Sequence, residues 1–181
     1  MKESEAELEK IAEILDYAIK NESVVSIFTN RNDPEKCCVG FVGCHDRGVI
    51  IKHITPMGLY DGFYWRRVDD IYRIDIDGKY ESDIKKLYLL QGQKHDLLNY
   101  AETDSDSLAI LLKYASQKQK IIDICIDESE TQEEIVGNVF YDSTMDFLKI
   151  NRIDNLKRNN GITFINMSDI VKCCVDAEDN R

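Results

Sequence analysis

The sequence has 181 residues, of which 43% are hydrophobic, and it carries a formal net charge of −11 at pH 7. The hydrophobic content excludes global disorder, no apolar run is long enough to span a membrane, and the acidic balance weighs against a protein that neutralises many phosphates. The amino terminus is acidic and unlike a signal peptide, so we expect a cytoplasmic protein without membrane association.

The six cysteines are expected to be free thiols, because a cytoplasmic protein lies in a reducing compartment. The sequence has no Cys-x-x-Cys motif, and its three histidines lack the spacing of metal ligands. We therefore predict no metal and no cofactor.

The first predicted element is a helix with a Glu-rich opening turn, which suits the helix dipole. Its apolar stripe follows helical spacing and consists of Leu8, Ile11, Ile14, Leu15 and Ala18. Five short strand-like runs follow, separated by turn-forming residues. They read VVSIFT, CCVGFVGC, VIIKHIT, GFYWRR and DIYRIDI.

The stretch GLYDGFYWRRVDDIYRI, from Gly58 to Ile74, combines aromatic residues with arginine, as surfaces that stack single-stranded nucleic acid do. The candidate contacts to RNA or to another partner are Tyr60, Tyr64, Arg66, Arg67 and Arg73. Alternation along a strand, however, places Arg66 and Arg67 on opposite faces. Packing is therefore the favoured role for Phe63, Trp65, Tyr72 and Ile74.

Residues 79–104 are predicted to form a partly helical connector. Ile84 and Tyr88 follow helical spacing, and Gly92 stands where a helix would end. A second helix is then predicted, with Asp104, Ser105 or Asp106 as its cap and with the stripe Leu108, Leu111, Leu112 and Ala115. Five more runs follow it, IIDICI, EIVGNVFY, DFLKINRI, GITFIN and DIVKCCV.

The two sets of elements match when the sequence is shifted by 97 residues, which pairs Gly40 with Gly137 and Lys52 with Lys149. Beyond Ile54 a two-residue insertion changes the shift to 99, which pairs Gly62 with Gly161. Repetition of this kind indicates a duplicated unit, and five short strands behind a helix favour a small closed barrel. We therefore predict a mainly β fold with helices (α+β), in which residues 1–78 and 105–181 form two tandem barrels joined by the connector 79–104.

This arrangement, with a glycine in the second strand, resembles the Sm-like proteins, which include the Sm and LSm proteins and the bacterial host-factor RNA chaperone. Their first motif is matched by Gly40, Val42, Asp46, Val49 and Ile51. Their second motif resembles YWRRVDDIYRI, with Arg67 as its arginine and Val68 in place of its glycine. The second copy keeps Gly137 and Val139 but has Ser143 for the aspartate and Asn166 for the arginine. An SH3-like barrel shares much of this pattern.

The resemblance implies a role for Gly40 and Gly137 as barrel glycines, which let the second strand curl. RNA-binding members of the family also use an aromatic residue or histidine, an asparagine and the motif arginine. The first two positions are Gly48 and Ile50 here, and Met145 and Phe147 in the second copy, so only Arg67 matches. The usual uridine pocket is not formed by matching residues, and fold alone does not carry function across.

Catalytic motifs are not evident. Cys44 and His45 are adjacent in a predicted strand and point to opposite faces, which is poor geometry for a nucleophile and its base. We predict no enzymatic activity. Two hypotheses remain: a protein assembly or adaptor module that binds a protein partner, or itself, through strand edges, and an RNA-binding regulator that uses Arg67 and exposed aromatic residues in a modified pocket. The first is favoured.

Overall fold

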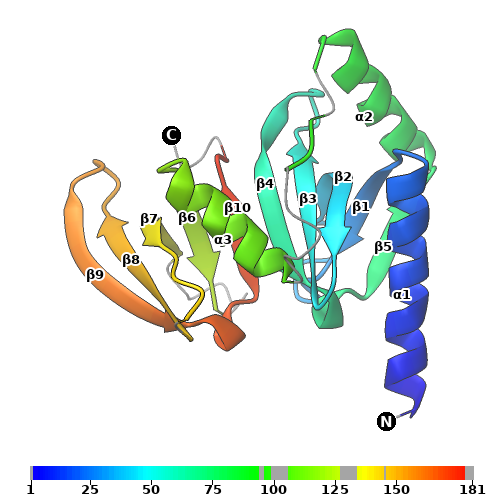
Figure 1. Ribbon diagram of the computed structural model, residues 1–181. Helices are drawn as coiled ribbons and strands as arrows, with labels where there is room; N and C mark the ends of the chain where they lie inside the picture. The colour runs from blue at the N-terminus through cyan, green and yellow to red at the C-terminus, as the bar shows by residue number, and fades with distance from the viewer. Residues whose placement is uncertain (1, 94–95, 99–105, 127–133, 145, 178–181) are drawn as a thin grey trace.

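The computed structural model describes residues 2–93, 96–98, 106–126, 134–144 and 146–177. Within these residues there are three helices, α1 (Lys2–Lys20), α2 (Lys79–Leu90) and α3 (Ser107–Gln117) (Figure 1). The strands of the first half are β1 (Val24–Phe28), β2 (Cys38–His45), β3 (Gly48–Ile54), β4 (Tyr60–Arg67) and β5 (Arg73–Ile76). Those of the second half are β6 (Ile121–Cys125), β7 (Ile135–Phe140), β8 (Phe147–Ile153), β9 (Asn159–Asn166) and β10 (Lys172–Val175). A short 3₁₀ helix precedes β5, η1 (Val68–Asp70), and another precedes β10, η2 (Met167–Asp169).

The strands form one antiparallel sheet in the order β5-β1-β2-β3-β4-β10-β6-β7-β8-β9. The second half therefore repeats the strand order of the first, and β4 pairs with β10 to join them. The prediction of an α+β fold is confirmed, and the ten strands of the two predicted tandem units form a single continuous sheet. Closure of either half into a barrel is not shown and stays a prediction.

Backbone geometry repeats along with the strand order. Four pairs of residues with positive φ occupy matching places in the two halves: Glu22 and Gln119, Gly58 and Lys157, Gly62 and Gly161, and Asp77 and Asp176. The first pair is 97 residues apart and the others are 99 apart, the two shifts found in the sequence. The left-handed conformation is uncommon for residues with a side chain, so its recurrence at matching turns indicates that the two halves bend the chain alike.

The pairing of the strands shows that the two-residue insertion lies before the third strand, and not beyond Ile54 as the sequence predicted. Val42 pairs with Ile51 in the first half, and Val139 pairs with Ile150 in the second. The shift is therefore already 99 in the third strand, and the insertion lies in the turn before it. Lys52 corresponds to Asn151, and its match with Lys149 in the sequence was coincidental.

Gly40 and Gly137 lie at equivalent points of β2 and β7, where each strand passes very close to the next one. A Cβ atom at Gly40 would lie 2.0 Å from the carbonyl oxygen of Lys52, and one at Gly137 would lie 2.2 Å from that of Asn151. Only glycine permits this approach of two backbones.

The helices cover different faces of the sheet. α1 contributes Leu15 and Ala18 to a core with Ile51, whereas α3 packs over Trp65 and Ile124. Because Ile51 pairs with Tyr64, the neighbouring Trp65 points to the opposite face. α3 thus lies on the opposite face of the sheet from α1 and spans the junction, since its core includes Ile50 and Trp65 of the first half and Ile124 of the second.

α2 confirms the prediction of a helix in the connector. Its buried residues Ile84 and Tyr88 pack against Phe41, and Gly92 follows the helix with a φ of +68°. The remainder of the connector falls largely outside the described residues. The cap of α3 is Asp106, whose carboxylate accepts from the backbone N–H groups of Leu108 and Ala109 at 3.0 and 3.4 Å; Asp104 and Ser105 lie outside the described residues. Among the helices described here, none is long and apolar enough to cross a membrane.

Candidate interaction edges

β4 contains the aromatic stretch singled out in the sequence, and it lies in the middle of the sheet. Trp65 pairs with Cys173 and Phe63 with Val175 across the junction of the two halves. Both aromatic side chains are buried beneath α3, with Trp65 only 2% and Phe63 only 6% exposed. These two residues therefore hold the halves together and do not present a stacking surface.

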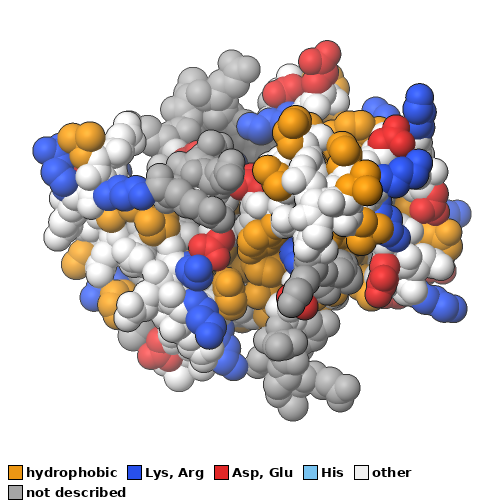
Figure 2. Space-filling model, turned by 90° about the horizontal axis from the view of Figure 1, so that it is seen from above, with side chains coloured by type: hydrophobic (Ala, Val, Ile, Leu, Met, Phe, Trp, Pro, Cys, Tyr) orange, Lys and Arg blue, Asp and Glu red, His pale blue; other side chains and the backbone are white. Residues whose placement is uncertain are grey.

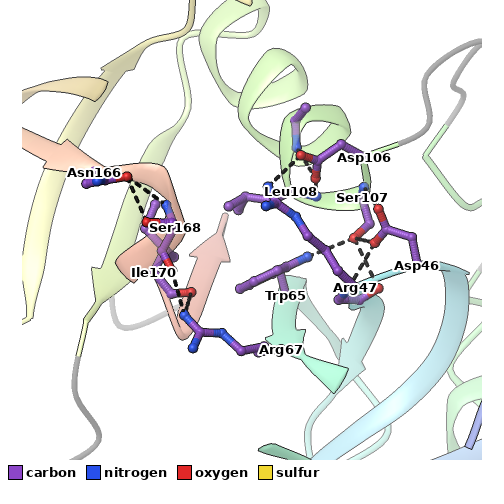
Figure 3. Close-up of polar contacts among 12 residues, drawn as sticks. Asp46, Arg47, Trp65, Arg67, Asp106, Ser107, Leu108, Asn166, Ser168 and Ile170 are labelled. Carbon is purple, nitrogen blue, oxygen red and sulfur yellow. Dashed lines mark hydrogen bonds and ion pairs between the residues drawn. The ribbon is translucent and has the colours of Figure 1, made fainter. Parts of the chain in front are cut away.

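Polar contacts fasten the β2–β3 turn to the start of α3 (Figure 3). The indole N–H of Trp65 donates to Ser107 Oγ at 2.9 Å. The Ser107 hydroxyl in turn contacts the Asp46 carboxylate, which also accepts from the Ser107 backbone N–H at 3.1 Å. Arg47 pairs with Asp106 at 2.6 Å. Asp46 therefore acts here as an anchor between the two halves.

Gly48 completes this junction. A Cβ atom at this position would lie 2.2 Å from the indole of Trp65, so the ring rests directly on the glycine. The space above Gly48 is thus filled by the tryptophan ring.

The structure does not bring the five predicted contact residues together on one open surface. Arg67 donates to the backbone carbonyls of Ser168 at 2.9 Å and Ile170 at 3.0 Å, which ties β4 to η2 (Figure 3). Arg66 is buried, donates to the Trp65 carbonyl at 3.0 Å and lies 5.4 Å from the Tyr64 ring.

The other three predicted residues are also engaged within the fold. Arg73 is exposed on β5 and forms a two-pronged pair with Asp75. Tyr64 stacks on His53 with ring centroids 4.3 Å apart, and Tyr60 lies near Lys52, 5.3 Å from ring to ammonium. Of the five, only Arg66 and Tyr64 are neighbours on one face.

An exposed apolar surface lies instead on the second half, and the sequence analysis missed it. This surface, the β7–β9 face, consists of Phe140, Phe147, Ile162 and Phe164. The register places Phe140, Lys149 and Phe164 side by side across three strands, and Phe147 opposite Asn166. The Lys149 ammonium lies 5.5 Å from the centre of the Phe140 ring.

The internal repeat alone would have predicted burial for this face. Phe164 corresponds to Trp65, and Ile162 corresponds to Phe63, at a shift of 99 residues. Yet Phe164 is 64% exposed and Ile162 57%, against 2% and 6% for their counterparts. The cause is the place of each strand in the sheet. β4 pairs with β10 and is covered by α3, whereas β9 is an outermost strand in the part of the chain that the structure describes.

At the opposite end of the sheet, residues of β5 and α1 are more exposed than their counterparts on β10 and α3. Ile74 and Ile76 on β5 are half-buried, whereas their counterparts on β10, Cys173 and Val175, are fully buried. On the helices, Ile11 and Ile14 of α1 are half-buried, whereas Leu108 and Leu111 of α3 are fully buried. Residues that are buried on β10 and α3, at the internal junction, therefore have partly exposed counterparts on β5 and α1.

Two of the cysteines and two of the histidines have pKa values or contacts set by the fold. Burial raises the pKa of Cys38 to about 12 and that of Cys44 to about 11, so both are thiols at neutral pH. His45 points to Asp16 at 2.8 Å, and burial lowers the pKa of His53. Within the described ranges no three His, Cys, Asp or Glu side chains are grouped to hold a metal.

A buried carboxyl lies next to the junction. Burial raises the pKa of Asp123 on β6 to about 7, against the opposing attraction of Lys172. Lys172 on β10 binds Glu134 at 2.7 Å, and this contact lowers the pKa of Glu134. Asp123 on β6 is thus a group that can bind a proton beside the junction, next to the strand β10 that carries Lys172.

Comparison of the chain with protein-family models, with curated protein sequences and with solved structures gave no match.

Proposed function

We propose that this chain is a non-enzymatic binding protein that assembles with a polypeptide through an open strand edge of its sheet. In this proposal the two halves are duplicated Sm-like units, and the first half shows how such an edge is used. There β4 receives β10 along its backbone and α3 over its aromatic side chains.

The observation that carries the proposal is the exposure of β9 and its apolar face. An outermost strand presents N–H and C=O groups that another strand can pair with. Apolar surface of this kind beside such an edge marks an interaction site on a soluble protein. β9 combines both features, since Ile162 and Phe164 lie on the edge strand itself.

Electrostatics favours a polypeptide over RNA as the partner. The chain has a net charge of −11, and the arginines expected to meet phosphate are engaged elsewhere. RNA remains the second candidate because of one observation, the row Phe140–Lys149–Phe164, in which a cation stands between two exposed rings. Single-stranded nucleic acid stacks on surfaces of this composition.

The test is capture of partners from the native cytoplasm by the wild-type chain and by Phe164→Glu, which places a charge on the edge. A second apolar surface provides the control: Leu90, near the end of α2, is 83% exposed, and Figure 2 shows hydrophobic side chains over this part of the molecule. We expect both the wild type and Leu90→Glu to capture a protein partner, in a complex that survives nuclease treatment and increasing salt concentration. Phe164→Glu is expected not to capture this partner. Retention of RNA that falls steeply with salt would support the second candidate.

A further inference from the structure

We propose that the β7–β9 face binds an apolar segment of another protein that carries one acidic side chain, and that Lys149 pairs with this carboxylate. The inference rests on the proposed function and names the chemistry of its partner.

The β7–β9 face differs from its counterpart in the first half, which α3 covers. The shift of 99 residues relates Phe147 to Gly48 and Phe164 to Trp65. In the first half the indole of Trp65 fills the space above Gly48, where a Cβ atom would lie only 2.2 Å from the ring. In the second half Phe147 has a side chain at this place, and it is 55% exposed. The β7–β9 face therefore does not repeat the surface that receives α3, and we expect a partner of a different kind.

Lys149 lies in the middle of this face. The register places it between Phe140 and Phe164, and its ammonium lies 5.5 Å from the centre of the Phe140 ring. Its counterpart is Ile50, which is only 1% exposed in the core beneath α3. A lysine that loses water beneath an apolar partner destabilises the complex unless it gains a counter-charge. No carboxylate among the described residues forms an ion pair with Lys149, so the partner has to supply one.

The charge of the surrounding hairpin also favours an anionic group. The strands β8 and β9 and their turn, residues 147–166, carry one acidic residue, Asp154, and four basic ones, Lys149, Arg152, Lys157 and Arg158. Asp154 is itself paired with Arg158 at 2.8 Å. Figure 2 shows Lys and Arg side chains beside hydrophobic ones at the end of the molecule that this hairpin forms. Because salt screens exposed charges that lie more than about 8 Å apart, a bound segment meets this local charge more than the distant acidic residues.

One lysine between two rings suits one carboxylate better than a chain of phosphates. RNA brings a phosphate with every nucleotide, and its binding depends on several cations. A polypeptide can instead present a single Asp or Glu between apolar residues, and these would cover Phe147, Ile162 and Phe164 of the face.

The experiment is selection from a random peptide library on the immobilised wild-type chain and on variants. Lys149→Glu reverses the charge in the face, and Lys10→Glu, at an exposed position of α1, is the matched control. We expect the wild type and Lys10→Glu to select peptides with an acidic residue between apolar ones. Lys149→Glu is expected to select Lys or Arg in place of the acidic residue, and Phe164→Glu is expected to select neither kind of peptide.

Titration of one selected peptide measures the contribution of the pair. Lys149→Glu should weaken its binding about tenfold or more, because like charges then meet in a contact that excludes water. The same peptide with lysine in place of its acidic residue should recover binding to Lys149→Glu. Circular dichroism verifies folding, and Lys149→Met, which should lose the preference for acidic peptides, replaces Lys149→Glu if the latter does not fold.

Selected peptides that require Phe164 but bind the wild type and Lys149→Glu equally would overturn the pairing with Lys149. A wild type that selects no peptide requiring Phe164, or that binds poly(U) through Phe164 and Lys149 instead, would also overturn it. If Phe164-dependent capture of a protein from the cytoplasm persists in these cases, the proposed function stands with a partner of other chemistry. If that capture also fails, both are wrong.

Discussion

Trp65 and Phe164 are equivalent residues of two similar strands, yet one is buried and the other exposed. Trp65 fills the space between Gly48 and α3 and hydrogen-bonds Ser107, whereas Phe164 stands on an outermost strand. The environment of an aromatic residue in this protein is therefore set by what lies beyond its strand, and less by the strand itself.

Trp65→Ala is expected to lower the free energy of unfolding by about 3–5 kcal/mol, the usual effect of deleting a large buried aromatic side chain. Phe164→Ala, its matched control, is expected to change this quantity by less than about 0.5 kcal/mol under conditions in which the chain is monomeric. Denaturant titration of both variants measures the difference. Equal effects would contradict the burial of Trp65 at the junction.

Arg67→Ala is expected to destabilise the chain more than a typical surface substitution. Replacement of an exposed side chain without specific contacts usually changes the free energy of unfolding by less than about 0.5 kcal/mol. The two hydrogen bonds from Arg67 to backbone carbonyls raise this expectation to about 1–3 kcal/mol, since charge-assisted bonds contribute more than neutral ones. Both bonds come from one guanidinium nitrogen, Nη2, and a lysine ammonium also carries several N–H groups, so Arg67→Lys should recover part of the loss.

Among the elements, β4 and β9 share a glycine with positive φ near the strand start. A Cβ atom at Gly62 would lie 2.2 Å from the carbonyl oxygen of Val175, whereas nothing described lies within 4 Å of one at Gly161. The same conformation thus serves a close approach in the first half and faces open space in the second.

Gly62→Ala is therefore expected to destabilise the chain more than Gly161→Ala. Both variants bear the strain of a positive φ, about 1–3 kcal/mol, and only the first also meets a backbone oxygen. Thermal melting of the two variants in monomeric conditions provides the comparison.

The sequence predicted the two helix-led sets of strands, the connector helix and the paired glycines Gly40 and Gly137, because these depend on local periodicity and on repetition. It did not predict the union of both sets into one sheet. The pairing of β4 with β10 joins residues far apart in the chain, and no local pattern around Trp65 states which strand will lie beside it. The β7–β9 face was missed for the same reason, since exposure of Phe164 depends on an absent neighbour.

At the scale of the whole molecule, the buried carboxyl of Asp123 links stability to pH. Its pKa is near 3.8 when unfolded and about 7 when folded. The folded state thus holds a proton that the unfolded state releases, and the resulting stabilisation is complete below about pH 4 and is lost as pH rises through about 7.

Asp123→Asn is expected to remove this dependence. Relative to the wild type, the variant should gain stability between pH 5 and pH 8, with a slope of at most about 1.4 kcal/mol per pH unit. Denaturant titrations across this range measure it. A constant difference between the two proteins would mean that Asp123 is ionised throughout.

The central place of β10 has a consequence for synthesis on the ribosome. The residue that pairs with Arg66 is Lys172, and more than a hundred residues of chain must be made between them. Until β10 has been made, the edge of β4 that carries Phe63 and Trp65 has no strand to pair with in the nascent chain. In the finished molecule β10 occupies this edge. Neighbouring ribosomes on one message would bring such edges together, so exchange of β10 between nascent chains is the misassembly to which this topology is most exposed.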